Sequence, residues 1–211
     1  MEIINDINLD LVTLYRVVKH HLEEFIRYFK WILVSRDEFY RFRKEDPETL
    51  TDIQKAVRFY YLLKLGYAAR IKDPSFNIVT TAKPRLNLLR IEEELSAVHL
   101  RLSRVYIENR SYAEIFARFD KPDTFFYIDP PYYGYEDYYG DGIFDRSDFM
   151  KLRDILARVT GKFILSINDV DHIRDLFQGF RIETVQTSYS AAGANKKKRV
   201  NELLIMNYEP V

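Results

Sequence analysis

The chain has 211 residues, of which 47% are hydrophobic and 30% charged, and its formal net charge is zero. This composition excludes disordered, fibrous and strongly basic proteins. The absence of cysteine excludes disulfides and thiolate metal sites, and four scattered histidines lack metal-ligand spacing, so we expect no bound metal. No stretch has the pattern of a signal peptide or a membrane span, which favours a cytoplasmic protein with no membrane partner.

The first half of the chain is predicted to be mainly helical. A short strand over residues 2–4 leads into a turn, where Asn8 is the predicted N-cap of a helix over residues 9–30. The apolar positions of that helix recur at helical spacing: Leu11, Leu14, Tyr15, Val18, Leu22, Phe25 and Phe29. Further helices are predicted over residues 35–42, 50–65 and 86–103, with irregular structure over 66–84.

The second half alternates between strands and helices. The apolar run at 124–128 predicts a buried strand, and a helix follows over 146–159 with Ser147 as its predicted N-cap. The remaining predicted elements are a strand over 162–167, a helix over 169–177, and two strands over 181–189 and 200–207. This order predicts an α/β sheet with helices on its faces, beside a helical subdomain.

Asp129-Pro130-Pro131-Tyr132 directly follows the strand predicted over 124–128. Ligands of open α/β sheets bind outside the carboxyl ends of the strands. The prolines have no backbone N–H, so a carboxylate and free carbonyls form a site rich in acceptors, which suits the NH2 group of an aromatic ring. Tyr132 offers a flat face on which an extruded base can stack. The alternative interpretation is a strand that ends in a rigid turn.

Four segments, in this order, resemble the Dam-type (D12 class) DNA adenine-N6 methyltransferases. They are Ile-Asn-Asp-Ile-Asn at 4–8, Arg-Phe-Tyr-Tyr-Leu at 58–62, Phe-Tyr-Ile-Asp-Pro-Pro-Tyr at 126–132 and Asn-Glu-Leu-Leu-Ile-Met-Asn-Tyr at 201–208. The resemblance implies a Rossmann-like S-adenosylmethionine-dependent methyltransferase sheet with a helical target-recognition subdomain. It assigns residues 1–15 and 106–211 to the catalytic domain and residues 16–105 to target recognition of double-stranded DNA.

The same resemblance implies roles for single residues. Asp6 would bind the ribose hydroxyls of S-adenosylmethionine, although a carboxylate in a helix-entry turn is the alternative. Asp129 would bind the target amine beside the cofactor, and Tyr132 would stack on the base, within the motif that includes Pro130 and Pro131. The methyl group would pass directly from sulfonium to nitrogen, without a metal or a covalent enzyme intermediate.

Charge is unevenly distributed, which bears on DNA binding. Residues 16–110 carry a net charge of +6, whereas residues 1–15 and 111–211 each carry −3. A basic middle segment can hold phosphates, although a solvated helical face would look the same. Lys196, Lys197, Lys198 and Arg199 are predicted to contact backbone phosphates, or to form a solvated hairpin tip. The aromatic segment at 58–62 could touch DNA, but core packing is the favoured interpretation.

The chain also departs from the family pattern. It has no Phe-x-Gly-x-Gly loop; its Gly-x-Gly sequence, Gly140-Asp141-Gly142, follows the catalytic motif, and Leu65-Gly66-Tyr67-Ala68 replaces an Asn-rich segment. Such glycines let the backbone approach a ligand closely. We therefore expect a sheet truncated at the N-terminus, with unpaired edges that favour self-association or a missing N-terminal segment, and weak binding of S-adenosylmethionine.

Two alternative functions stay open at this point. The chain could be a non-enzymatic DNA-binding remnant of such an enzyme, or an amino-methyltransferase that acts on cytosine N4 or on protein glutamine. In the wider family Ser or Asn is commoner at the first motif position for those substrates, so Asp129 favours adenine.

Overall fold

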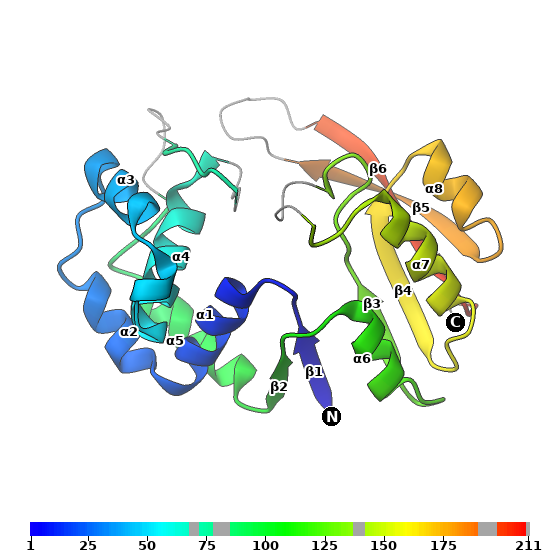
Figure 1. Ribbon diagram of the computed structural model, residues 1–211, viewed down its shortest axis with the longest axis horizontal. Helices are drawn as coiled ribbons and strands as arrows, with labels where there is room; N and C mark the ends of the chain where they lie inside the picture. The colour runs from blue at the N-terminus through cyan, green and yellow to red at the C-terminus, as the bar shows by residue number, and fades with distance from the viewer. Residues whose placement is uncertain (68–71, 78–84, 137–141, 190–197, 210–211) are drawn as a thin grey trace. The chain divides into compact units, whose positions relative to one another are not determined.

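The computed structural model describes residues 1–67, 72–77, 85–136, 142–189 and 198–209. The chain forms two compact units, Met1–Arg110 and Ser111–Val211, and each is described by itself (Figure 1). The packing of the chain into two units does not show which residues catalyse and which recognise DNA. The predicted division into a catalytic domain and a target-recognition domain therefore stays a prediction. The positions of Gly193, Lys196 and Lys197 lie outside the described residues.

The first unit combines a helical bundle with a two-stranded parallel sheet. Its elements are β1 (Glu2–Asn5), α1 (Leu9–His20), α2 (Leu22–Phe29), α3 (Arg36–Lys44), a 3-10 turn (Pro47–Thr49), α4 (Asp52–Leu65), α5 (Ile91–Leu102) and β2 (Val105–Glu108). β1 and β2 pair in parallel, with Glu2 opposite Val105 and Asn5 opposite Glu108. The mainly helical character predicted for this region is confirmed.

The helix predicted over residues 9–30 is in fact two helices. Asn8 is the N-cap of α1, as predicted, because its Oδ1 accepts the N–H groups of Asp10 at 2.9 Å and Leu11 at 3.2 Å. The prediction of one continuous helix is wrong at His21, whose backbone leaves the helical region at φ −136° and ψ 37°. The hydrophobic spacing continues across this break because both helices pack on the same core.

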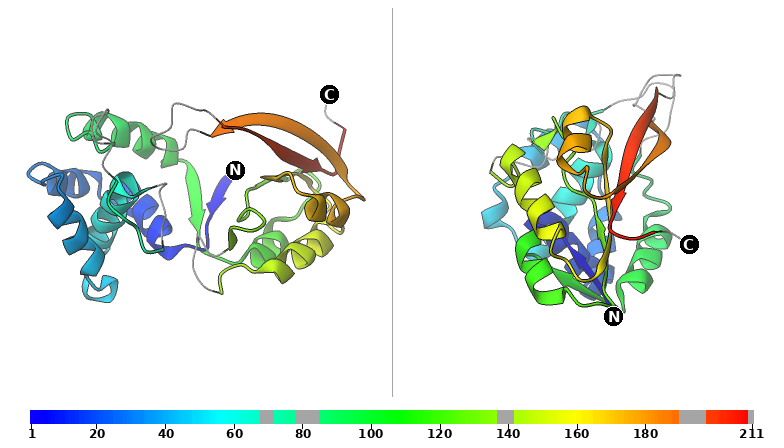
Figure 2. Two further views of the ribbon diagram at one scale, coloured as in Figure 1. Left: turned by 90° about the horizontal axis from the view of Figure 1, so that it is seen from above. Right: turned by 90° about the vertical axis from the view of Figure 1, so that its right-hand side faces the viewer.

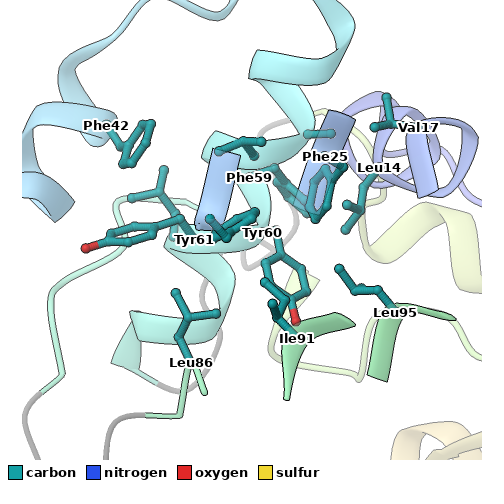
Figure 3. Packing of buried hydrophobic residues seen from close by; sticks show 14 of the residues in the cluster. Leu14, Val17, Phe25, Phe42, Phe59, Tyr60, Tyr61, Leu86, Ile91 and Leu95 are labelled. Atoms are coloured by element: carbon teal, nitrogen blue, oxygen red, sulfur yellow. The ribbon is translucent and has the colours of Figure 1, made fainter. Parts of the chain in front are cut away.

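Buried aromatic rings from several helices fill the core of the first unit (Figure 3). α4 begins with a capping box in which Thr51 and Gln54 satisfy each other's backbone N–H groups, which stabilises its first turn. The rings of Phe25 and Phe29 both meet Tyr60 edge-on, with centroids 5.7 and 5.6 Å apart. Such edge-to-face contacts add to the free energy of burial.

The boundaries of α5 and α3 and the presence of β2 differ from the sequence-based expectation. α5 begins at Ile91 rather than near residue 86, and its first turn carries Glu92, Glu93 and Glu94, which suit the positive end of the helix dipole. α3 extends two residues past the predicted end at 42. The four-residue strand β2 was not predicted, because so short an element offers little periodicity.

The second unit is a four-stranded sheet with helices on one face. Its elements are α6 (Tyr112–Phe119), β3 (Phe125–Ile128), α7 (Arg146–Leu156), β4 (Lys162–Asn168), α8 (Asp171–Leu176), β5 (Arg181–Tyr189) and β6 (Lys198–Met206). The sheet order is β3-β4-β6-β5, in which β3 and β4 are parallel and the other pairs antiparallel. Helices α6, α7 and α8 lie on the same face of the sheet (Figure 2). The predicted alternation that ends in a hairpin is confirmed, whereas α6 was not predicted.

Two local predictions in this unit are wrong. The N-cap of α7 is Asp145 rather than Ser147, since the Asp145 carboxylate accepts the Ser147 N–H at 2.6 Å. The strand before the motif is also not buried on both faces: Phe125 is 55% exposed and Tyr127 66% exposed. β3 lies at the edge of its sheet, and only Phe126 and Ile128 pack against the core beneath the helices.

The two units have separate hydrophobic cores. The largest fully buried side chains of the second unit include Phe149, Phe163 and Phe177, which come from helices and strands on both sides of its core. In the described part of the chain, no helix has the length and apolarity needed to cross a bilayer.

Candidate active site

The Asp129-Pro130-Pro131-Tyr132 motif begins directly after β3, where the carboxyl ends of the parallel strands β3 and β4 meet. The side chain of Asp129 is exposed, and Pro130 is buried against the unit. Within the ranges that the structure describes, no donor forms a hydrogen bond with the Asp129 carboxylate or the Pro130 carbonyl. Among the described residues, both acceptors therefore lack a protein donor.

The local environment makes Asp129 harder to ionise than an ordinary aspartate. Partial burial raises the pKa of Asp129, and the negative charge of Glu202 raises it further. The carboxylate is thus accessible at its outer side while the surrounding protein weakens its hydration. Hydrogen-bond donors or a positive charge on a ligand would stabilise the ionised form of such a carboxylate.

Tyr132 is fixed through its hydroxyl group. The half-buried ring presents a hydroxyl that donates a hydrogen bond to Glu202 Oε1 at 2.8 Å. Its carbonyl accepts the N–H of Tyr135 at 2.8 Å, which closes a turn, and Gly134 within that turn has a φ of 89° that L-residues rarely adopt. The phenol is held at its polar end by the protein.

The next residue, Tyr133, anchors the loop to the body of the unit. Its ring lies 4.8 Å from the His172 ring and 5.5 Å from the Phe149 ring, and the Arg146 guanidinium lies 5.3 Å from its centroid. Asn168, the last residue of β4, holds both backbone polar groups of Tyr133. The backbone immediately after the motif is therefore attached to α7 and β4.

In the first unit, Asp6 occupies the corresponding position after β1. One oxygen of its carboxylate accepts the Asn8 N–H at 2.7 Å, and Asn109 donates to the carbonyls of Asp6 and Ile7 at 2.8 and 3.1 Å. Burial raises the pKa of Asp6, although the hydrogen bond from Asn8 opposes that shift. The helix-entry role is therefore present in the structure.

The helix-entry role does not exclude ligand binding by Asp6. Its carboxylate is half-buried, and among the described residues its second oxygen has no hydrogen-bond partner. A partly desolvated carboxylate with a free oxygen fits a pair of ribose hydroxyl donors. The carboxylate acceptor at this strand end is therefore compatible with the ribose of S-adenosylmethionine.

The aromatic segment of α4 packs in the core. Phe59, Tyr60 and Tyr61 are buried, as the favoured interpretation predicted (Figure 3). The Arg58 guanidinium donates to the carbonyls of Phe42 at 2.7 Å and Arg43 at 3.3 Å, which caps the last turn of α3. These contacts assign the segment a structural role.

The predicted phosphate-binding run is only partly described. Lys198 begins β6, and Arg199 is exposed on the same strand, opposite Ser188 of β5. Arg199 therefore lies at the end of the β5-β6 hairpin where the chain passes from one strand to the other. Its contact with DNA stays a prediction.

Two residues that contact the motif were not predicted from the sequence. Asn168 ends the predicted strand at 162–167, and Glu202 lies inside the predicted terminal strand. A polar side chain at the carboxyl end of a strand next to the motif strand was the available clue for Asn168. Glu202 directly precedes the apolar run Leu203 to Met206 of the same strand, which was the clue in its case.

The family comparison agrees with this geometry. Residues 1–191 match the model of the D12 class N6 adenine-specific DNA methyltransferases. The chain belongs to this family. The matched range includes Asp6 and the whole of the Asp129–Tyr132 motif.

Similar proteins from a bacterium, a virus and an archaeon support the assignment of this methyltransferase to the family. It is 27% identical to the DNA adenine methylase of Escherichia coli strain K12, over 99% of this chain and 79% of that protein. It is 26% identical to the type II methyltransferase M.CviBI of Paramecium bursaria Chlorella virus NC1A, over 85% and 69%. It is 28% identical to the type II methyltransferase M.MjaIII of Methanocaldococcus jannaschii, over 98% and 80%.

Proposed function

We propose that this methyltransferase transfers a methyl group from S-adenosylmethionine to N6 of adenine in double-stranded DNA, with the Asp129–Tyr132 motif as its catalytic site. The observation that supports this most directly is the pair of free acceptors, the Asp129 carboxylate and the Pro130 carbonyl, at the end of β3. An amino group attached to a purine has two hydrogens to donate, which match the two acceptors of this site.

The motif would act on the base by orienting and polarising its amino group. The lone pair of adenine N6 is delocalised into the ring, which makes this nitrogen a poor nucleophile. Two acceptors on its hydrogens favour a more tetrahedral nitrogen and return the lone pair to it. The negative charge of Asp129 also favours the positive charge that develops on N6 during the transfer. The base must leave the duplex to reach the motif, and the Tyr132 ring would stack against it.

The cofactor would be held in part by Asp6. When bound, S-adenosylmethionine supplies a methyl group made electrophilic by a positively charged sulfur. Asp6 would accept hydrogen bonds from the ribose hydroxyls, and Asp129 would lie beside the cofactor as well as the amine. We also infer that the sheet follows the Rossmann-like pattern of these enzymes and that residues 16–105 recognise the DNA. A DNA substrate is consistent with the predicted cytoplasmic location.

Methylation of DNA with labelled cofactor tests the proposal. The full chain is incubated with unmethylated genomic DNA and millimolar S-adenosylmethionine that carries a labelled methyl group, and nucleosides are separated after digestion. We expect label in N6-methyladenine. Asp129→Asn should lower the rate by about 100-fold or more, as removal of one charge-stabilising group does elsewhere. Asp123→Asn is the matched control, because Asp123 is an exposed aspartate just before β3, and its rate should equal the wild-type rate.

Other products would identify the alternatives. Label in N4-methylcytosine or in protein glutamine would assign the chain to a different amino-methyltransferase activity. Equal rates for wild type and Asp129→Asn would contradict the assignment of the catalytic site.

The absence of a Gly-rich loop in the sequence favours one second candidate, a DNA-binding protein without activity. This candidate predicts DNA binding with no methyl transfer at any cofactor concentration. Binding of double-stranded DNA should weaken with salt in both cases, and Arg199→Ala should reduce the salt dependence by about one phosphate contact. The methylation assay therefore separates the two candidates, and the binding assay tests the predicted phosphate contact.

A further inference from the structure

Asn168 and Glu202 face each other across the antiparallel strands β4 and β6. Side chains of directly opposed residues project from the same face of a sheet. Asn168 is the last residue of β4, so this cross-strand pair lies at the sheet end where the motif loop begins. Both side chains contact the loop, and they contact consecutive residues.

The two contacts are of different kinds. Asn168 Oδ1 accepts the Tyr133 N–H at 2.8 Å, and Asn168 Nδ2 donates to the Tyr133 carbonyl at 3.1 Å. Glu202 Oε1 accepts the Tyr132 hydroxyl at 2.8 Å. The first contact fixes the backbone after the motif, and the second fixes the far end of the motif's aromatic ring.

We propose that Asn168 and Glu202 form a positioning pair that holds the Tyr132 ring in place for the target base. The proposal rests on the function proposed above, in which Tyr132 stacks on the base. Neither residue needs to contact the substrate: Asn168 acts through the main chain of Tyr133, and Glu202 acts through the Tyr132 hydroxyl.

The prolines explain why this backbone needs a side-chain anchor. Pro130 and Pro131 have no N–H, so the loop cannot continue the hydrogen-bond ladder between β3 and β4. The Asn168 amide offers one donor and one acceptor, which is what a neighbouring strand would offer, and it binds Tyr133 as a substitute for that strand. Tyr132 therefore lies between a rigid Pro131 and an anchored Tyr133, which leaves its backbone little freedom.

The Glu202 contact controls the remaining freedom, which is rotation of the side chain. A hydroxyl that donates to a carboxylate forms one of the stronger hydrogen bonds in proteins. With its hydroxyl held by Glu202, the Tyr132 ring cannot swing about its Cα–Cβ bond without breaking that hydrogen bond. Pre-orientation of a stacking surface reduces the entropy that must be lost when the base docks.

Amide hydrogen exchange tests the Asn168 contact without any need for activity. In the full chain, Asn168→Leu should accelerate exchange of the Tyr133 amide by about fivefold or more, which corresponds to the loss of one hydrogen bond. Asn207→Leu is the matched control. Asn207 holds the other end of β4 in the same two-point manner, accepting from Phe163 N–H at 3.1 Å and donating to the Gly161 carbonyl at 2.9 Å.

The control separates positioning from general loss of stability. Asn207→Leu should destabilise the unit by a similar amount and leave the relative protection of Tyr133 unchanged. Equal effects of the two variants on Tyr133, or no effect of Asn168→Leu, would overturn the Asn168 half of the proposal.

A double-mutant cycle tests the Glu202 contact. Glu202→Leu and Tyr132→Phe should each lower kcat by about tenfold, the order expected for a hydrogen bond to a charged group, with little change in KM for DNA. The double variant should be no slower than either single variant, because both remove the same bond. Glu202→Gln keeps the acceptor and should retain most of kcat. Glu183→Leu, on the neighbouring strand β5, should retain all of it.

Failure of this inference differs from failure of the proposed function. Additive losses in the double variant, or a purely KM effect, would show that Glu202 does not act through Tyr132. A wild-type chain that transfers no methyl group would refute the proposed function instead. In that case the Tyr133 exchange rates still decide whether Asn168 anchors the loop.

Discussion

Asp129 illustrates a conflict between function and stability at a single residue. In the proposed function its carboxylate is ionised when it binds the amine, whereas burial and the charge of Glu202 raise its pKa. Because the pKa is higher in the folded state than the 3.8 of a free aspartate, ionisation of Asp129 opposes folding. The stabilising contribution of this group is complete below pH 3.8 and is lost as the pH rises through the folded-state pKa.

We therefore predict that Asp129→Asn gains stability relative to wild type as the pH rises. The difference in free energy of unfolding between variant and wild type should be constant below pH 3.8, increase above it, and level off beyond the folded-state pKa. Urea denaturation at a series of pH values measures this difference. The same substitution should slow methyl transfer by about 100-fold or more, so the substitution that stabilises the protein would also impair it.

For Asp120→Asn we predict that stability depends on pH in the opposite direction to Asp129→Asn. Burial opposes ionisation of Asp120, but hydrogen bonds from Thr160 and Gly161 outweigh it and leave its pKa lowered. Its contribution is therefore present at neutral pH and lost as the pH falls below 3.8. If the two variants showed the same pH trend, the electrostatic explanation for Asp129 would be refuted.

Tyr61 shows how one hydroxyl holds a loop of the first unit. The fully buried ring places its hydroxyl where it donates to the Leu33 carbonyl at 2.7 Å and accepts the Ser35 N–H at 3.2 Å. Tyr61→Phe should lower the free energy of unfolding by about 1–3 kcal/mol, since it leaves these backbone groups unpaired. Tyr28→Phe, at a ring that is 47% exposed, should change it by less than about 0.5 kcal/mol. Chemical denaturation measures both, and equal effects would contradict the assigned role.

At the scale of elements, asparagine side chains repeatedly fix the ends of strands. Asn5 exchanges two hydrogen bonds with the backbone of Arg110, at 3.0 and 2.9 Å, and Asn168 and Asn207 do the same at the two ends of β4. In each case the side-chain amide pairs with backbone groups where the regular ladder stops. Of the two candidate ligand carboxylates, Asp6 follows Asn5 at the end of β1, and Asp129 belongs to the loop that Asn168 holds at Tyr133.

The start of β4 depends on a glycine for a steric reason. A Cβ atom on Gly161 would lie 2.7 Å from the Thr124 carbonyl oxygen and 2.9 Å from that of Lys121, both of them backbone atoms. Gly161→Ala should therefore force β4 away from the loop before β3 and destabilise the protein by about 1–3 kcal/mol. Gly179→Ala meets no atom within 4 Å and should have an effect below about 0.5 kcal/mol. Urea midpoints that are equal for the two variants would contradict this explanation.

The elements that could be predicted from sequence are those with a repeated pattern. The helix at 52–65 and the strands at 162–168 and 181–189 follow their hydrophobic spacing closely. The break at His21 and the short elements β2 and α6 could not be predicted, because packing partners distant in sequence decide them. The same reason applies to the site: Asp129 was found from its motif, whereas Glu202 reaches Tyr132 only through the pairing of β6 with β4.

At the scale of the whole molecule, the exposed face of β3 is consistent with the sheet edge expected from the sequence. Phe125 and Tyr127 are exposed, Phe125 lies 6.3 Å from the Tyr208 ring, and the Lys162 ammonium lies 5.3 Å from that ring. Within the described residues β3 pairs with β4 alone. An edge strand with exposed aromatic side chains is a site where another strand can add. Self-association therefore stays a prediction, which sedimentation of the chain over a range of concentrations would test.

The cofactor affinity is the property of the whole chain that the sequence and structure constrain most. In the proposed function Asp6 would bind the ribose and Asp129 would lie beside the cofactor, but the 211 residues contain no Phe-x-Gly-x-Gly loop. Glycines of that kind bring backbone N–H groups within hydrogen-bond distance of a ligand, which side-chain carboxylates cannot replace because they only accept. Two carboxylates alone should bind a cofactor with millimolar affinity at best.

We therefore predict that calorimetry detects no binding of S-adenosylmethionine to this chain tighter than about 100 μM, which corresponds to roughly 5.5 kcal/mol of binding free energy. Asp6→Asn should weaken whatever binding is observed, because an amide donates where the ribose hydroxyls need an acceptor. Asp10→Asn, on the first turn of α1, is its matched control and should leave the affinity unchanged. Micromolar binding to the wild-type chain would show that other residues supply the missing donors, and the low affinity argued from the absent loop would then be wrong.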